Sequence, residues 1–343
     1  KDRPMLPFID LHCDTLYRTV SYPERFFASG AAVSTHVFHS GLLESRCTLQ
    51  CFAFFTDLCE SHDQPPLSSV QKQYDCFRHI LSKAEKSMMQ IKTRSDLAAC
   101  LRQNKTGALL TLEESCLGSE PAALLSDLYS LGVRIATLTW DYSTILAGSA
   151  ANAAPSPEGF ASAYTAPLLK SATADTGLTP HGFSFLEEAE HLGIIIDVSH
   201  LSDRGFFDVA THSKKPFLAS HSNARSVRDV PRNLSDDMLR ILGNRGGLTG
   251  LCFHEPFLAS SPCSAGNISE ALIRHVKHIL SIAGSDILAL GTDFDGTPGN
   301  RIIPDVTKLF RLEDLLKKAG LTGSQIEKIF YKNALRFFRE NLP

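Results

Sequence analysis

The chain has 343 residues, of which 43% are hydrophobic and 21% are charged, and its formal net charge is −3 at pH 7. These proportions are typical of a globular enzyme with a substantial core. The small net charge argues against the basic surface that binds nucleic acid or anionic membranes. No apolar run reaches the roughly 18–20 residues that a membrane-spanning helix needs, so we expect neither nucleic acid nor membrane as a partner.

The terminal segments and the cysteines indicate the cellular compartment. The N-terminal residues lead into the first apolar run without a secretory signal, and the C-terminal residues lack the hydrophobic tail of a lipid-anchor signal. The nine cysteines include no C-x-x-C pair, which favours reduced thiols. We therefore expect a cytoplasmic protein.

Eight short apolar runs are predicted to be β-strands, at residues 7–11, 48–55, 107–112, 134–139, 193–198, 216–220, 247–252 and 287–292. Helical periodicity fills most of the gaps between them. Strands that alternate with helices imply parallel pairing, and eight of them predict a closed barrel rather than an open sheet. The expected fold is α/β, a single (β/α)8 TIM-type barrel domain over residues 1–343.

Three of the predicted helices have clear apolar stripes, at about 119–132, 267–283 and 324–339. On the second of them, His275 and His278 are three residues apart, and we expect both on a solvated face. The segment 142–180 follows the fourth strand and is rich in Ala, Ser, Gly and Pro. Loops that follow strands lie on the catalytic face of a barrel, so this segment is expected to wall or cover a substrate.

Five of the predicted strands end in side chains that can bind a metal ion: His12 and Asp14, Glu113, His200, His221, and Asp293. Alternation along a strand places His12 and Asp14 on one face. A single histidine at a strand end is usually solvated, and one His-X-Asp pattern occurs often by chance. The recurrence at five strand ends carries the signal, because these ends meet on one face of a barrel. Imidazole and carboxylate suit zinc and its neighbours, so the pattern predicts metal-dependent hydrolysis.

Seven motifs follow in order along almost the whole chain: residues 10–15 (DLHCDT), the strand that ends in Glu113, 177–180 (GLTP), 196–200 (IDVSH), 220–225 (SHSNAR), 232–233 (RN) and 291–296 (GTDFDG). With these motifs the chain resembles the membrane (renal-type) dipeptidase family of zinc metallopeptidases, within the amidohydrolase-like barrels. Without a leader or an anchor signal, it looks like a bacterial member.

The resemblance implies two Zn²⁺ ions per chain. Five residues would hold them: His12 and Asp14 at one ion, His200 and His221 at the other, and Glu113 as a bridge between both. A water shared by two metal ions is acidified and becomes a nucleophile. Glu114 is the alternative bridge, but alternation points its side chain away from that of Glu113, which favours Glu113.

The resemblance also implies roles around the metals. Asp293 would take a proton from the attacking water and pass it to the leaving amine, whereas the alternative is that it only caps a turn. Arg232 would bind the terminal carboxylate of the substrate, a task suited to a planar guanidinium, with Arg225 as a rival. Trp140 stands where mammalian members have a histidine that steadies the oxyanion, so we place it beside the substrate and question the substrate range. His254 is a further residue that could line the pocket.

The predicted function is zinc-dependent hydrolysis of short peptides with a free C-terminal carboxylate, including L-Xaa-D-Xaa and L-Xaa-L-Xaa dipeptides, by a hydroxide that bridges the metals. The partner is a small dipeptide, and a homodimer is compatible with the sequence. One alternative is a barrel amidohydrolase that acts on another amide, a lactam or a lactone, which would not need Arg232. The other is a non-catalytic binding protein on the same fold, against which Asp293 and the complete ligand set argue.

Overall fold

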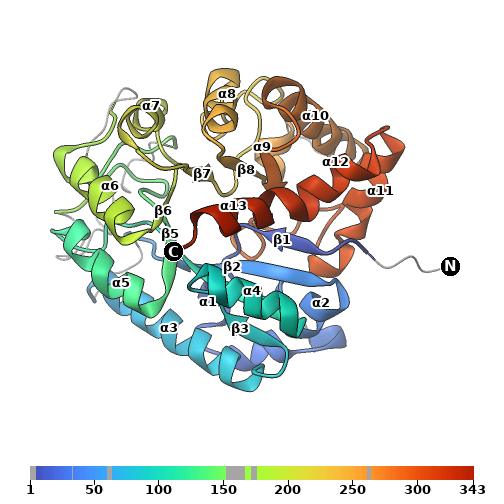
Figure 1. Cartoon of the computed structure of the whole chain (residues 1–343), viewed down its shortest axis with the longest axis horizontal. Helices are drawn as coiled ribbons and strands as arrows, with labels where there is room; N and C mark the ends of the chain where they lie inside the picture. The colour runs from blue at the N-terminus through green and yellow to red at the C-terminus, as the bar shows by residue number, and fades with distance from the viewer. Residues whose placement is uncertain (1–4, 33, 60–63, 152–166, 171–175, 261–263) are drawn as a thin grey trace.

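The computed structural model describes residues 5–32, 34–59, 64–151, 167–170, 176–260 and 264–343. Its sheet has nine parallel strands, and β2 also pairs with β4, which closes a ring (Figure 1). The ring consists of β1 (Phe8–Asp10), β2 (Cys47–Phe55), β4 (Thr106–Glu113), β5 (Val133–Thr137), β6 (Ile195–Asp197), β7 (Leu218–Ala219), β8 (Leu248–Leu251) and β9 (Leu288–Leu290). All eight predicted strands and the TIM-type barrel are thereby confirmed.

The ninth strand, β3 (Met88–Gln90), was not predicted. It pairs only with β4, at Met88 with Thr106 and Gln90 with Ala108, before β5 joins that edge. Three residues of mixed burial give too short an apolar run to be recognised in the sequence.

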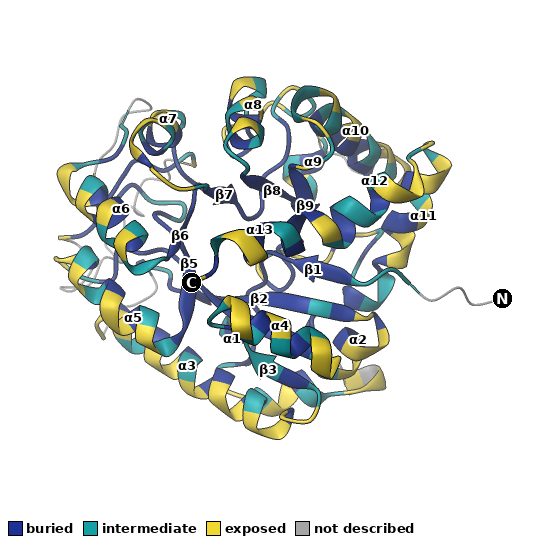
Figure 2. Cartoon of the chain, in the orientation of Figure 1, coloured by how far each residue is buried: buried dark blue, intermediate teal, exposed yellow. Residues whose placement is uncertain are grey.

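Helices surround the ring and expose their outer faces (Figure 2). They are α1 (Thr15–Thr19), η1 (Pro23–Phe27), η2 (Gly30–Ala32), α2 (His39–Glu44), α3 (Pro66–Lys83), α4 (Arg94–Gln103), η3 (Pro121–Leu124), α5 (Leu125–Leu131), α6 (Pro180–Leu192), α7 (Asp203–His212), α8 (Asp236–Asn244), α9 (Glu255–Leu258), α10 (Ala265–Ala283), η4 (Val306–Lys308), α11 (Phe310–Lys318), α12 (Gly323–Glu327), η5 (Lys328–Lys332) and α13 (Asn333–Asn341). Across the described ranges, none is long and apolar enough to cross a membrane.

Local sequence signals set several helix ends. Thr93 and Asp96 form a reciprocal capping box at the start of α4. Gly132 ends α5 in the left-handed conformation that glycine adopts without a steric penalty, as expected from the sequence. The predicted helix over 324–339 is interrupted by the single π-helical turn η5, so it forms three successive segments.

The barrel interior is filled at one end by apolar side chains. One buried cluster includes Ile9, Leu49, Leu109, Ile135, Ile195, Leu218 and Leu248 from the strands together with Phe337 and Phe338 from α13. In Figure 1, α13 crosses in front of the strands and closes this end. The functional site must therefore lie at the opposite end, where the strands terminate.

The expectation for His275 was wrong. Its side chain is completely buried, because α10 packs against α8 and α9. Nδ1 accepts a hydrogen bond from the backbone N–H of Ala224 at 3.2 Å, and Nε2 donates to the carbonyl of Leu258 at 3.1 Å. His278 is partly exposed and lies 2.7 Å from Asp236. The predicted covering segment 142–180 lies outside the described residues at 152–166 and 171–175.

Candidate active site

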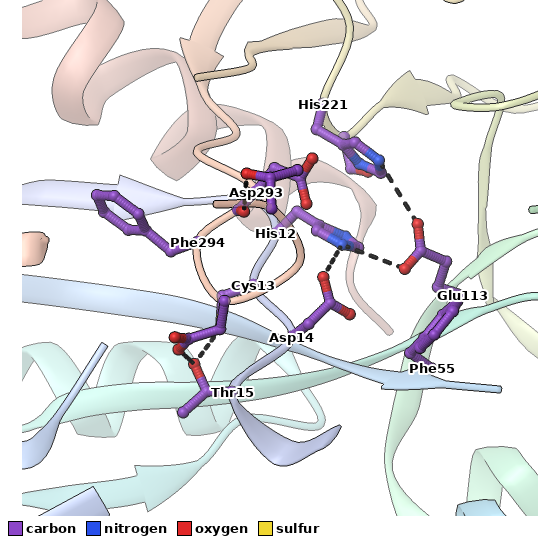
Figure 3. A network of polar contacts seen from close by, with 12 residues as sticks. His12, Cys13, Asp14, Thr15, Phe55, Glu113, His221, Asp293 and Phe294 are labelled. Carbon is purple, nitrogen blue, oxygen red and sulfur yellow. Dashed lines mark hydrogen bonds and ion pairs between the residues drawn. The ribbon is translucent and has the colours of Figure 1, made fainter. Parts of the chain in front are cut away.

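The metal-binding side chains predicted at five strand ends come together at the open end of the barrel. They are His12 and Asp14 after β1, Glu113 at the end of β4, His200 after β6, His221 after β7 and Asp293 after β9. Figure 3 shows those from four of these ends, at β1, β4, β7 and β9. Each is at most 7% exposed. The parallel direction of the strands produces this convergence, because every strand of the ring ends on the same face.

Glu113 lies at the centre of the cluster. Its Oε2 is 3.5 Å from Nε2 of His12, and its Oε1 is 3.0 Å from Nε2 of His200 and 3.5 Å from Nε2 of His221. On the other side, Nε2 of His12 lies 3.2 Å from Oδ2 of Asp14. One carboxylate thus directs its two oxygens toward two separate sets of donors.

The donor set fits two metal ions. Three overlapping groups have donor atoms within 4.8 Å of one another: His12, Asp14 and Glu113; Glu113, His200 and His221; and His12, His221 and Asp293. Oδ1 of Asp14 is buried without a hydrogen-bond partner among the described residues, and a bound cation would satisfy it. Imidazole nitrogens with carboxylate oxygens are suitable ligands for zinc and related divalent ions.

Two of the histidines are oriented by a hydrogen-bonding partner at Nδ1. Nδ1 of His200 lies 3.0 Å from Oδ1 of Asp141, and Nδ1 of His221 lies 2.7 Å from the hydroxyl of Ser220. Asp197 in turn accepts a hydrogen bond from the backbone N–H of Ser220 at 2.9 Å. Such contacts fix the tautomer that presents Nε2 to a metal. The sequence interpretation missed Asp141, although it is the first acidic residue after the strand predicted at 134–139.

Burial and neighbouring charge set the ionisation of these groups. Burial raises the pKa of Asp293 to about 7, although His12 and His200 oppose the change. Burial also raises the pKa of Asp14 to about 6, and Glu113 adds to the effect. Burial alone would also raise the pKa of Glu113, but this pKa is lowered because His12 and His200 stabilise the charged carboxylate. Glu113 is therefore the group that carries the negative charge at the centre of the site.

Several site residues have strained backbone. His200, Asp293, Asp295 and Glu114 have φ of 66°, 60°, 68° and 68°, in the left-handed region that non-glycine residues rarely adopt. Such strain is common where function requires one side-chain position. Gly296 shows how closely the site is packed, because a Cβ there would lie 2.2 Å from Oδ2 of Asp14 and 2.4 Å from Oδ1 of Asp293.

Glu114 does not share the face of Glu113. Its buried carboxylate accepts hydrogen bonds from the backbone N–H groups of Cys116 at 2.8 Å and Trp140 at 3.0 Å. Burial raises the pKa of Glu114 to about 7. Its role in the structure is to hold the segment that carries Trp140 and Asp141.

A cavity of about 400 Å³ opens above the cluster. Its lining includes Asp14, Glu113, His200 and Asp293 from the cluster, the aromatic residues Tyr17, Phe55, Trp140 and Phe257, and the polar residues Arg18, Asp141, His254, Asp295 and Thr297. Trp140 packs edge-on against Phe55, with ring centroids 4.9 Å apart. The size suits a small ligand of one or two residues.

The two arginines considered for substrate binding differ in their surroundings. Arg225 forms a bidentate ion pair with Asp203, in which Nη1 and Nη2 each lie 2.6 Å from a carboxylate oxygen. Its Nε donates to the carbonyl of Asn233. Arg232 is 6% exposed, and its guanidinium carbon lies 5.4 Å from the ring centroid of Phe257. Phe257 lines the cavity, whereas Arg232 is not among the lining residues. Arg225 is thus committed to local structure, whereas Arg232 lies next to the site.

Arg232 retains unused hydrogen-bonding capacity. Its Nη1 donates to the hydroxyl of Ser222 at 2.9 Å and its Nη2 to the carbonyl of His221 at 3.2 Å. Nε is buried without a partner among the described residues. Since a guanidinium has five N–H donors, a ligand group could still engage this side chain.

Comparisons with known proteins identify the family of the chain. The family model "Membrane dipeptidase (Peptidase family M19)" matches residues 4–342. An uncharacterized dipeptidase of Schizosaccharomyces pombe is 29% identical over 316 residues, which cover 88% of this chain and 72% of the relative. A Klebsiella pneumoniae protein, uncharacterized and encoded in the pqqA 5′ region, is 28% identical over 80% of this chain and 96% of its own length.

Solved structures show the same fold. A metallo peptidase from Rhodobacter sphaeroides, liganded with a phosphinate mimic of the dipeptide L-Ala-D-Ala, superimposes with a TM-score of 0.82 at 23% identity, over 99% of this chain and 100% of that one. A probable dipeptidase from Pseudomonas aeruginosa superimposes with a TM-score of 0.80 at 17% identity, over 99% and 96% of the two chains. Since the family model spans nearly the whole chain, the chain belongs to the membrane dipeptidase family of metallopeptidases, peptidase family M19.

Proposed function

We propose that the chain is a zinc dipeptidase that holds two Zn²⁺ ions and hydrolyses dipeptides with a free C-terminal carboxylate, both L-Xaa-D-Xaa and L-Xaa-L-Xaa. The observation that carries the proposal is Glu113, whose two oxygens face His12 on one side and His200 with His221 on the other. Asp14 would complete the first set. The related fold from Rhodobacter sphaeroides, which carries a mimic of L-Ala-D-Ala, supports the dipeptide as substrate.

When bound, two zinc ions would supply Lewis acidity, which lowers the pKa of water and polarises an amide carbonyl. Asp293 would move the proton. Its Oδ2 accepts a weak hydrogen bond from the S–H group of Cys252 at 3.7 Å. Its Oδ1 would then accept a proton from the attacking water and return it to the leaving amine. A carboxyl with a pKa near 7 serves both steps, because it gains and loses a proton readily at neutral pH.

Arg232 would bind the terminal carboxylate of the substrate. Its buried position makes an ionic contact strong, and its unpaired Nε and remaining N–H donors are available for it. The indole of Trp140, in the cavity wall, would lie beside the scissile bond and offer at most one hydrogen bond, without a cationic form.

The first prediction separates a dipeptidase from a general amidase. Arg232→Ala should lower kcat/KM for free dipeptides by roughly 30-fold or more, because a lost charge pair in a desolvated site costs about 2–5 kcal/mol. Dipeptide amides should lose far less, since they never form the contact. Steady-state kinetics on matched acid and amide substrates, at full metal loading, measures the contrast.

Arg228→Ala is the matched control, because it removes a half-buried arginine from the same loop, outside the cavity lining, whose guanidinium donates to the carbonyl of Pro256 and the hydroxyl of Ser260. Equal losses for acid and amide in Arg232→Ala would remove Arg232 from the proposed role. The absence of Arg232 from the cavity lining favours a second candidate function, a barrel hydrolase of a neutral amide, lactam or lactone. That function predicts that amides react as fast as free acids in the unmodified chain.

A further inference from the structure

A second arginine, Arg18 in α1, lies at the mouth of the barrel in a different sector from Arg232. Around the ring, the strand order is β1, β9, β8, β7, β6, β5, β4 and β2. Arg18 follows β1, whereas Arg232 follows β7, and two strands separate them on one side and four on the other. Unlike Arg232, Arg18 belongs to the cavity lining.

The guanidinium of Arg18 is held in place but is not neutralised. Its Nε donates to the backbone carbonyl of Asp295 at 2.7 Å. The described part of the chain provides no ion pair and no partner for its two terminal nitrogens. Its one contact therefore anchors the side chain and leaves a planar pair of donors with a full positive charge at the cavity edge.

The side chain of Asp295, whose carbonyl Arg18 contacts, is already hydrogen-bonded. The carboxylate of Asp295 accepts hydrogen bonds from the hydroxyl of Thr15 at 2.6 Å and from the backbone N–H groups of His36 at 2.6 Å and Val37 at 3.3 Å. It is 3% exposed. Arg18 thus contacts the backbone of Asp295 and not its charge.

An aromatic wall connects Arg18 to the metal-binding cluster. Tyr17 packs edge-on against Phe55 at 5.1 Å between ring centroids, and Phe55 packs in the same way against Trp140 at 4.9 Å. All three line the cavity together with Arg18. A ligand group that extends along this wall would have apolar contact for its methylene groups and a cation at its end.

We propose that Arg18 selects dipeptides whose N-terminal residue has a side-chain carboxylate, such as L-Glu-L-Xaa. The inference rests on the proposed dipeptidase function. With the terminal carboxylate at Arg232 and the scissile bond over Glu113, the N-terminal residue extends toward the sector of β1 and β2. Its side chain then follows Phe55 and Tyr17 and meets the terminal nitrogens of Arg18, which bind a carboxylate in a two-pronged manner.

The test compares two substrates that differ only in charge. Metal-loaded enzyme is assayed with L-Glu-L-Ala and L-Gln-L-Ala, and the ratio of their kcat/KM values is measured. We expect a preference for L-Glu-L-Ala of about tenfold, the scale of one hydrogen-bonded charge pair. Arg18→Gln should reduce the ratio to about 1, and Arg18→Lys should restore part of it. The preference should weaken as salt increases, because the pair lies at an exposed edge.

Arg25→Gln is the matched control, since it removes the same charge from an exposed arginine that stacks 4.6 Å over Tyr22, outside the cavity lining. It should keep the ratio of the unmodified chain. Hydrolysis of L-Ala-L-Ala with equal rates for the Glu and Gln peptides would overturn the role of Arg18 and leave the dipeptidase intact. No hydrolysis of any dipeptide would overturn both. An effect of Arg18→Gln that disappears when the substrate is amidated at its C-terminus would assign Arg18 to the terminal carboxylate and overturn the proposal.

Discussion

At the scale of the single residue, Asp293 combines the properties that a proton carrier needs. It is buried, its backbone is held at φ 60°, and burial raises its pKa to about 7. Asp293→Asn should leave most of the metal bound but lower turnover by roughly 10²–10⁴-fold, the usual effect of losing a general base. Turnover numbers and metal content of the same preparation measure both effects. Turnover within a few-fold of the unmodified chain would show that Asp293 is not the proton carrier.

Asp141 is a positioning residue, since it acts through His200. Asp141→Ala removes the acceptor 3.0 Å from Nδ1 of His200 and should weaken metal affinity about 10–100-fold, the effect typical of a lost outer contact. Asp141→Asn keeps an oxygen acceptor in the same place and should restore much of the affinity. Competition with a chelator and the visible spectrum of the cobalt-substituted protein measure this directly. Unchanged affinity and spectrum in Asp141→Ala would contradict the assignment.

The sequence predicted site residues where one local rule applies. His12, Glu113 and Asp293 each end an apolar strand, and parallel strands bring such ends together. Asp141 was missed because its contact with His200 joins two loops that are far apart in the sequence. The burial of Arg232 against Phe257, outside the cavity lining, could not be predicted either, because it depends on how the loop after β7 packs against α9.

At the scale of the element, α10 carries a pH-sensitive contact. Burial lowers the pKa of His275 to about 4, whereas an unfolded histidine has a pKa near 6.5. Between these values His275 binds more protons in the unfolded chain than in the folded one, so its contribution to stability rises with pH in this window. The contribution is complete above pH 6.5 and is lost as the pH falls toward 4, by up to about 3 kcal/mol.

His275→Asn tests this contact. Asparagine can still accept a hydrogen bond from Ala224, but it does not titrate. The variant should be less stable at pH 7 and lose less stability on acidification to pH 4.5 than the unmodified chain. Denaturant unfolding of metal-free protein at both pH values provides the comparison. Parallel losses in the two proteins would show that His275 does not contribute to acid sensitivity.

The same helix shows what periodicity can and cannot predict. The apolar stripe of α10 predicted the helix, but the position of His275 on a solvated face was wrong, because α8 and α9 cover that side. Helix pairing depends on contacts that are distant in the sequence. The three-residue strand β3 was missed for a different reason, since its run is too short for a periodic pattern.

At the scale of the whole molecule, eight strand–helix alternations were enough to predict the barrel, because parallel strands of this number close on themselves. The closure of one end by α13 could not be predicted, since Phe337 and Phe338 form an amphipathic pattern that fits many partners. This closure determines which end of the barrel is open. The proposed metal-binding side chains that follow β1, β6 and β7 then lie around Glu113 of β4 at the open end.

The most direct test of the central claim is a zinc titration of the metal-free chain, followed by release of free amino acids from L-Ala-D-Ala and L-Ala-L-Ala. The five proposed ligands exceed the three protein ligands that one open catalytic zinc usually takes. We therefore expect activity to rise until about two equivalents of zinc per chain are bound, which elemental analysis should confirm. Saturation at one equivalent, or a fully loaded protein that releases no amino acid from either dipeptide, would contradict the account.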